Sequence, residues 1–76
     1  MKVNEFNTLT YRDKIVSLLD SRYLTTRIEK GYIVNLYELY GFFVEEFYDC
    51  QKNRIITFKT YLADKLQSKV YKYDLV

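Results

Sequence analysis

The side chains whose types suggest catalysis are two neighbouring carboxylates, Glu45 and Glu46. A pair of carboxyl groups can hydrolyse a glycosidic bond when the two groups flank that bond, one as the acid and the other as the nucleophile or base. Neighbouring residues of a strand point to opposite faces of the sheet, and a strand is the structure predicted below for this segment. The two carboxylates therefore cannot flank one bond, and we do not expect glycoside hydrolysis.

Most other catalytic and metal-binding chemistry lacks the residues that it requires. The chain of 76 residues contains no histidine, which is the commonest general base and a common zinc ligand. The single cysteine, Cys50, cannot form an intramolecular disulfide, and we interpret it as an unreactive loop residue of a protein from a reducing compartment. The sequence has neither a glycine-rich phosphate-binding loop nor a cluster of metal ligands. We therefore expect no enzyme activity, no metal and no cofactor.

The segment 31–49 decides the fold, and its seven aromatic residues fit two patterns. As one helix it would bury a stripe at spacings of three and four residues. That helix would expose Tyr37, Phe42 and Tyr48, and it would carry Gly41 near its middle. The stripe consists of Leu36, Leu39, Tyr40, Phe43, Val44 and Phe47.

Two strands explain the glycines better than one helix does. Gly31 and Gly41 are ten residues apart, and each can end a three-residue hairpin loop, 29–31 and 39–41. Such a loop ends on a residue with left-handed backbone, which glycine adopts without a steric penalty. We therefore predict a meander of antiparallel strands, at about 23–28, 32–38, 42–48 and 54–58.

Both ends of this meander have helical patterns. Thr10 can cap a helix that begins at Tyr11 and runs over about 11–21, with Asp13 in its first turn. Thr60 can cap a second helix over about 61–70. With no proline and only two glycines, the chain has no linker and forms one domain, residues 1–76. The prediction is an α+β, two-layer fold: a four-stranded antiparallel meander with one helix before it and one after it, both on one face.

Three-residue loops also assign side chains to the two faces of the sheet. The face predicted to form the core carries Leu24, Thr26, Ile28, Tyr32, Val34, Leu36, Phe42, Val44 and Tyr48. The other face is interrupted by Arg27, Asn35 and Glu45, yet it is too apolar for a solvent-facing surface. Aromatic residues are favoured interface anchors, so we predict a homodimer, or an unknown protein partner, on this face. The predicted interface consists of Tyr23, Ile33, Tyr37, Phe43 and Phe47.

The same assignment places Glu46 on the core side, where an unpaired carboxylate is costly. The simpler interpretation is a position at the rim of the core, or an ion pair with Arg54 or with a lysine of the last helix. The functional alternative is a buried acid with a raised pKa. We favour the first.

Nine tyrosines and an uneven charge distribution raise RNA binding as an alternative function. Bases stack on sheet aromatics in several RNA-binding modules. Residues 31–51 carry four acidic and no basic residues, whereas residues 52–76 carry six basic and two acidic residues. The acidic strands would repel phosphate, and mutual neutralisation of the two segments is the simpler interpretation. The alternative is an RNA-binding or translation-regulating protein that uses Lys59, Lys65, Lys69 and Lys72.

The first residues, MKVNEFNTLTYRDK, lack the apolar centre of a secretory signal. No apolar run approaches the length that spans a membrane. We therefore expect a cytoplasmic protein.

Three segments carry a resemblance to a known family: VNLYEL at 34–39, FFVEEFY at 42–48 and NRI at 53–55. Together with an apolar C-terminal helix, they resemble a family of short, uncharacterised bacterial proteins of nearly this length, over most of the chain. The resemblance implies an α-β-β-β-β-α order of elements and brings no established activity, cofactor or ligand with it. Glu46, where the family has an apolar residue, departs from the pattern, and so does the last helix, which lacks a proline-containing end.

Overall fold

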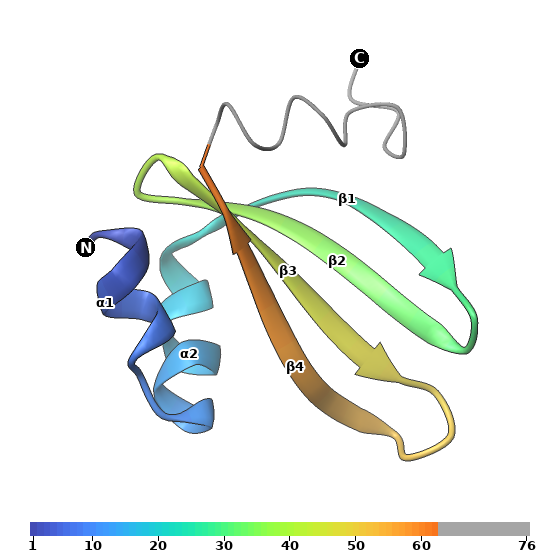
Figure 1. Cartoon of the computed structure of the whole chain (residues 1–76). Helices are drawn as coiled ribbons and strands as arrows, with labels where there is room; N and C mark the ends of the chain where they lie inside the picture. The colour runs from blue at the N-terminus through green and yellow to red at the C-terminus, as the bar shows by residue number, and fades with distance from the viewer. Residues whose placement is uncertain (63–76) are drawn as a thin grey trace.

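Helices come first along the chain and a four-stranded sheet follows, in a computed structural model that describes residues 1–62 (Figure 1). The sheet order is β1-β2-β3-β4, and all neighbouring strands are antiparallel, so the predicted meander is confirmed. The helical part consists of α1 (Val3–Asn7), α2 (Tyr11–Ser17) and the 3-10 turn η1 (Leu18–Asp20). The strands are β1 (Arg22–Glu29), β2 (Tyr32–Leu39), β3 (Phe42–Asp49) and β4 (Arg54–Tyr61).

The helical residues before the sheet are more divided than predicted. The Thr10 hydroxyl accepts a hydrogen bond from the Asp13 backbone N–H at 3.1 Å, so the predicted cap is confirmed. The α-helix that starts at Tyr11 then tightens into η1 instead of continuing to residue 21. The five-residue helix α1 was not predicted, because it is too short to produce a periodic pattern.

The predicted helix after the sheet does not begin where expected. Strand β4 continues through Tyr61, which was predicted to be the first residue of that helix. The rest of the predicted helix, and its place on a face of the sheet, fall outside the described residues.

Two tight turns fix how β2 aligns with its neighbours, and both contain two residues instead of the predicted three. Lys30 and Gly31 join β1 to β2 with φ angles of 45° and 89°, and Tyr40 and Gly41 join β2 to β3 with 49° and 87°. Two consecutive residues with positive φ are the mark of a type I′ turn, whose twist matches that of the flanking strands.

The shorter turn moves β3 by one residue against β2, and this moves its side chains to the other face. Val34 lies opposite Phe47 and Leu36 lies opposite Glu45, while Leu39 lies opposite Phe42. Relative to β2, the predicted division of side chains between the faces is therefore wrong for β3, and the shorter β1–β2 turn makes it wrong for residues 25–29 of β1 as well. In β1 a bulge at Leu24 restores the predicted pairing, so that Tyr23 still lies opposite Tyr37.

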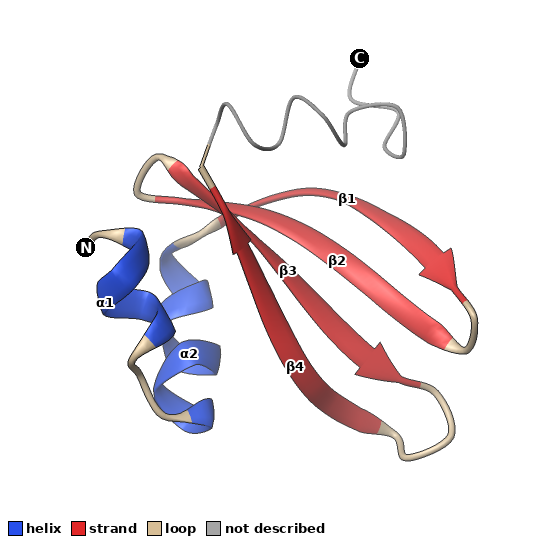
Figure 2. Cartoon of the chain, viewed as in Figure 1, coloured by secondary structure: helices blue, strands red, loops and turns tan. Residues whose placement is uncertain are grey.

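The helices pack on one face of the sheet, here called the helix-side face, and the other is called the opposite face. Phe6 of α1 is fully buried against side chains from the end of β2, from the beginning of β3 and from β4. Its ring meets those of Phe42 and Phe58 edge to face, with centroids 6.0 and 6.1 Å apart. The helices lie along β4 and beside the β2–β3 turn, whereas the end of the sheet at the β1–β2 turn extends away from them (Figure 2). The buried residues of this cluster are Phe6, Leu39, Phe42 and Val44.

A second apolar cluster lies on the opposite face. Leu36 is fully buried there, and Leu24, Phe43 and Tyr61 pack against it. Both faces of this small sheet therefore contribute buried residues, which a single predicted core did not anticipate.

Replacing Phe6 tests whether α1 holds the helices to the sheet. We expect Phe6→Ala to lower the free energy of unfolding by about 3–5 kcal/mol, because it leaves a cavity between α1 and the sheet. Leu19→Ala is the control, since the Leu19 side chain is 83% exposed and its removal should change stability by less than about 0.5 kcal/mol. Urea unfolding followed by circular dichroism measures both; equal effects would contradict this packing.

Replacing Gly31 isolates the backbone requirement of the first turn. A Cβ atom at Gly31 would meet no atom within 4 Å, so any loss of stability comes from the φ of 89° alone. We expect Gly31→Ala to lower the free energy of unfolding by about 1–2 kcal/mol. Lys30→Asn in the same turn should be neutral or stabilising, because asparagine tolerates the left-handed region better than lysine. Urea unfolding compares the two variants, and a neutral Gly31→Ala would contradict the type I′ assignment.

Candidate interaction surface

Four apolar side chains lie on the part of the helix-side face that extends beyond the helices. They form two pairs across β1 and β2, Tyr23 opposite Tyr37 and Ile28 opposite Ile33. The two tyrosine rings meet edge to face, with centroids 5.9 Å apart. Tyr23 is 55% exposed and Ile28 is 73% exposed, whereas Ile33 and Tyr37 are half-buried. These four residues are called the β1–β2 surface below.

A chain of hydrogen bonds crosses the strands between these two pairs. The Thr26 hydroxyl donates to Asn35 Oδ1 at 2.6 Å, so the hydroxyl of Tyr23, 2.5 Å away, donates to Thr26. Asn35 Nδ2 donates to Glu46 Oε1 at 3.2 Å, and the Tyr37 hydroxyl donates to the same oxygen at 3.3 Å. Each of these hydrogen bonds therefore donates toward Glu46: Tyr23 is connected to the Glu46 carboxylate through Thr26 and Asn35, and Tyr37 is connected to it directly. Such a network fixes the side chains that support the β1–β2 surface.

The position of Tyr37 changes its acidity. Burial raises the pKa of Tyr37 from its usual 10.0 to about 12, and the charge of Glu46 and the hydrogen bond to it add to this effect. Tyr37 therefore stays neutral and remains a hydrogen-bond donor at every physiological pH.

The predicted interface is divided between the two faces of the sheet. The structure brings Tyr23, Ile33 and Tyr37 together, as predicted, but it places Phe43 and Phe47 on the opposite face. Phe47 is only 7% exposed, and Phe43 is half-buried beside Leu36. The five residues therefore do not form one patch.

Sequence reasoning missed Ile28 as a member of the surface. It was assigned to the core, because a three-residue loop would place it opposite Tyr32 instead of Ile33. Ile28 lies opposite Ile33 because the turn contains only Lys30 and Gly31, and no periodic pattern in the sequence indicated this length.

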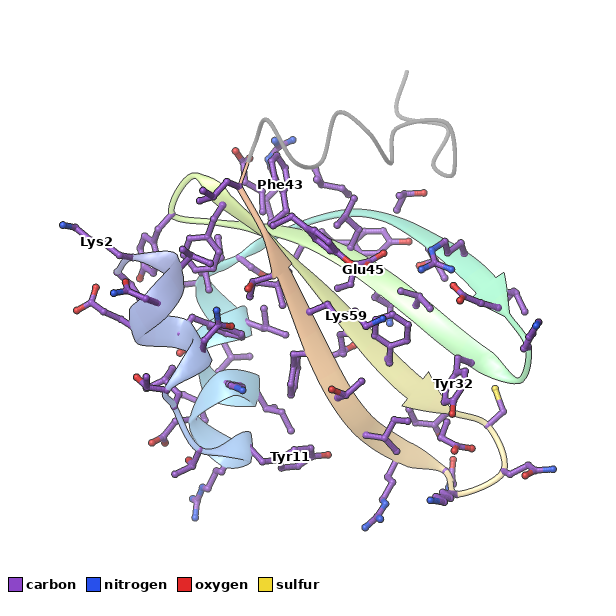
Figure 3. The ribbon with its side chains drawn as sticks, in the orientation of Figure 1. Lys2, Tyr11, Tyr32, Phe43, Glu45 and Lys59 are labelled. Carbon is purple, nitrogen blue, oxygen red and sulfur yellow. The ribbon has the colours of Figure 1, made fainter. Side chains whose placement is uncertain are left out.

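The two neighbouring carboxylates do point to opposite faces, but their predicted environments are exchanged. Glu46 is half-buried in the hydrogen-bond chain, and it is not paired with Arg54. Glu45, labelled on the sheet in Figure 3, is the buried acid and is 1% exposed. Arg27 Nη2 lies 3.2 Å from its carboxylate, and the Tyr61 hydroxyl donates to it at 2.6 Å. Arg27 also forms an ion pair with Glu29. Since Glu45 is held by these groups on the opposite face, the carboxylates cannot act on one bond.

Of the predicted nucleic-acid contacts, only Lys59 belongs to the described residues. Lys59 is exposed on the opposite face, and its Nζ lies 5.0 Å from the centroid of the Phe47 ring. Lys65, Lys69 and Lys72 fall outside the described residues, so the predicted set of four contacts stays a prediction.

Residues 1–62 contain no group of three acidic, cysteine or histidine side chains that could hold a metal ion. Cys50 is exposed in the turn between β3 and β4. In the same part of the chain, no helix has the length and apolar character needed to cross a membrane.

Comparison of the chain with protein-family models, with curated proteins and with solved structures found no match. The resemblance to a family of short bacterial proteins therefore stays a prediction.

Replacing Glu46 tests the hydrogen-bond chain through the acidity of Tyr37. We expect Glu46→Gln to lower the pKa of Tyr37 from about 12 only part of the way toward 10, because burial is the larger cause of the shift. Glu38→Gln is the control, since Glu38 is the next residue of β2, points to the opposite face and pairs with Arg22. Titration of ¹³C-labelled tyrosine by NMR measures the change; equal effects of the two variants would contradict the network.

The same shift makes folding depend on pH in the alkaline range. Unfolded Tyr37 loses its proton near pH 10, whereas folded Tyr37 keeps it until about pH 12. Its contribution to stability is therefore complete below pH 10 and is lost as the pH rises to about 12. In Tyr37→Phe, the free energy of unfolding should therefore fall less between pH 10 and about pH 12 than it does in the wild type. Urea unfolding at several pH values measures this difference.

Proposed function

We propose that this protein is a small, non-enzymatic protein-interaction module that forms a homodimer through the β1–β2 surface. The observation that carries the proposal is the exposure of Tyr23 and Ile28, 55% and 73%, on the part of the helix-side face that the helices leave uncovered. An apolar patch of this kind marks interaction sites on soluble proteins. Phe43 and Phe47, which face the other way, are no longer part of the proposed interface.

The chemistry of the surface suits protein contact. Tyrosine offers a large apolar ring with a polar tip and loses little conformational entropy on binding. The hydrogen bond from Tyr23 to Thr26 and the ring contact with Tyr37 already restrict the Tyr23 side chain in the monomer. A restricted side chain gives up less entropy when a partner covers it, which favours affinity.

A second copy of the chain is the partner that the charges favour. A two-fold dimer brings the same surface of each chain together, so any charge on the surface meets its own copy. Glu46 is the acidic residue of the hydrogen-bond network beside this surface, and its Oε1 already accepts hydrogen bonds from Asn35 and Tyr37. The four residues of the β1–β2 surface carry no charged side chain, so these four residues can meet their own copies without like-charge repulsion. A domain of this size also has a small core and gains stability by oligomerising.

Sedimentation velocity at micromolar concentrations tests the dimer. We expect the wild-type protein to be a dimer, and we expect Tyr23→Asp and Ile28→Asp each to weaken dimerisation by at least about tenfold, because each buries a carboxylate in an apolar contact. Both side chains are exposed in the monomer, so neither change should prevent folding, which circular dichroism checks.

The matched control is Thr57→Asp, which adds the same charge at an exposed position opposite Phe47, on the other face of the sheet. This variant should dimerise like the wild type. A strictly monomeric wild type would overturn the proposed self-association, and so would a dimer that Thr57→Asp weakens as much as Tyr23→Asp does.

A further inference from the structure

A cleft of about 540 Å³ lies where α2 meets the beginning of β4, away from the β1–β2 surface. Its lining combines an aromatic ring, two basic side chains and two aliphatic side chains. Tyr11 extends from α2 toward the lower end of β4 in Figure 3. A volume of this size is within the range of small-molecule sites, about 300–1,000 Å³. The lining residues are Tyr11, Lys52, Arg54, Ile55 and Ile56.

A bulge in β4 brings both isoleucines to the cleft. Tyr48 lies opposite Ile55 and Phe47 lies opposite Thr57, so Ile56 is the extra residue of β4. Neighbouring side chains of a regular strand alternate between faces, whereas a bulge interrupts this alternation and turns a side chain to a new direction. Ile55 and Ile56 can therefore line the same cleft and give it an apolar floor.

The aromatic wall of the cleft is fixed in place. The Tyr11 hydroxyl donates a hydrogen bond of 2.8 Å to the Ile55 carbonyl oxygen. The Tyr11 ring also packs against Phe58, with centroids 6.1 Å apart. These two contacts hold the ring across β4 while half of the side chain stays exposed, 51%.

The turn that carries the basic residues is also well fixed. Asp49 Oδ1 accepts backbone hydrogen bonds from Gln51 at 2.9 Å and from Lys52 at 3.1 Å. The Asn53 backbone N–H donates to the Asp49 carbonyl at 2.8 Å, and Asn53 has a left-handed φ of 56°. The backbone on which Lys52 and Arg54 sit is therefore held before any ligand arrives.

The charge of the cleft is positive. Lys52 and Arg54 are exposed, and none of the ion pairs within residues 1–62 involves either of them. The acidic residue paired with Arg54 across the strands is Asp49. The Asp49 carboxylate accepts the backbone hydrogen bonds of the turn. No carboxylate of residues 1–62 lines the cleft, so within this part of the chain two positive charges meet an aromatic ring and an apolar floor.

We propose that this cleft binds a small organic phosphate with a planar ring, of the mononucleotide class. Arg54 and Lys52 bind the phosphate, since guanidinium and ammonium groups form strong charge-assisted hydrogen bonds with phosphate oxygens. The ring packs against Tyr11 and the two isoleucines, which a bare phosphate ion would leave unused. The same phosphate and ring can come from a free nucleotide or from the 5′ end of an RNA strand.

Titration of ¹⁵N-labelled protein with adenosine monophosphate, followed by two-dimensional NMR, tests the site. We expect saturable shifts of the backbone amides of residues 51–56. Arg54→Ala and Lys52→Ala should each weaken binding on the order of tenfold, because each removes a charge-assisted contact with the phosphate. Adenosine and inorganic phosphate, which each offer half of the ligand, should both bind more weakly than adenosine monophosphate.

Lys59→Ala is the matched control, because it removes one positive charge from an exposed residue of the same strand that does not line the cleft. It should bind adenosine monophosphate like the wild type. Absence of saturable shifts overturns the proposal, as does equal weakening by Lys59→Ala or equal binding of inorganic phosphate. A 5′-phosphorylated RNA hexamer that shifts the same amides more strongly, and loses this with Arg54→Ala, supports the site and identifies RNA as the source.

Discussion

The two type I′ turns are the constraint on which the rest of this structure depends. Each joins its strands with two residues of positive φ, and the number of residues in the turn decides which side chains share a face. With two residues at 40 and 41, Glu45 faces Arg27 across β2 while Glu46 faces Asn35 and Tyr37. A loop longer by one residue would exchange these neighbours and would bring the Glu46 carboxylate among Val34 and Leu36. The turns therefore select the buried ion pair as well as the composition of the exposed surface.

A buried ion pair on the opposite face also favours the observed register of β2 and β3. Glu45 is 1% exposed, and a carboxylate at that depth needs partners, which Arg27 and Tyr61 supply. Replacing a buried ion pair by apolar residues is often neutral for stability, whereas leaving one charge without its partner is strongly destabilising. The pair therefore mainly makes other registers unfavourable, because a slip of one residue in β3 would separate Glu45 from Arg27 and leave a buried charge without its partner. Phe47 packs beside this pair: Arg27 Cζ lies 5.9 Å and Lys59 Nζ lies 5.0 Å from the centroid of its ring. Charged groups therefore surround the buried Phe47 ring on the opposite face.

Much of the fold could be predicted from the sequence, because strand positions depend on short-range patterns. The predicted strand starts at 32, 42 and 54 are those of β2, β3 and β4, and the Thr10 cap marks the start of α2. The turns could not be predicted, because Lys30 and Tyr40 occupy positions where asparagine, aspartate or glycine are usual. The predicted β2–β3 loop was one residue too long, and this error alone placed Phe43 and Phe47 on the same face as Tyr37. Phe6 could not be placed either, because a five-residue helix has no periodicity and its burial depends on contacts with residues far along the chain.

The candidate sites show the same limit, since each depends on an irregularity that periodic patterns do not contain. The bulge at Leu24 returns Tyr23 to the side of Tyr37, which completes the β1–β2 surface, and the bulge at Ile56 gives the basic cleft its apolar floor. Both bulges lie in the edge strands, where an extra residue disturbs only one neighbouring strand. The two sites also lie at different ends of the strand order, one on β1 and β2 and the other beside β4. A partner on the first surface therefore need not cover Lys52 and Arg54, so that occupation of one site leaves the other accessible.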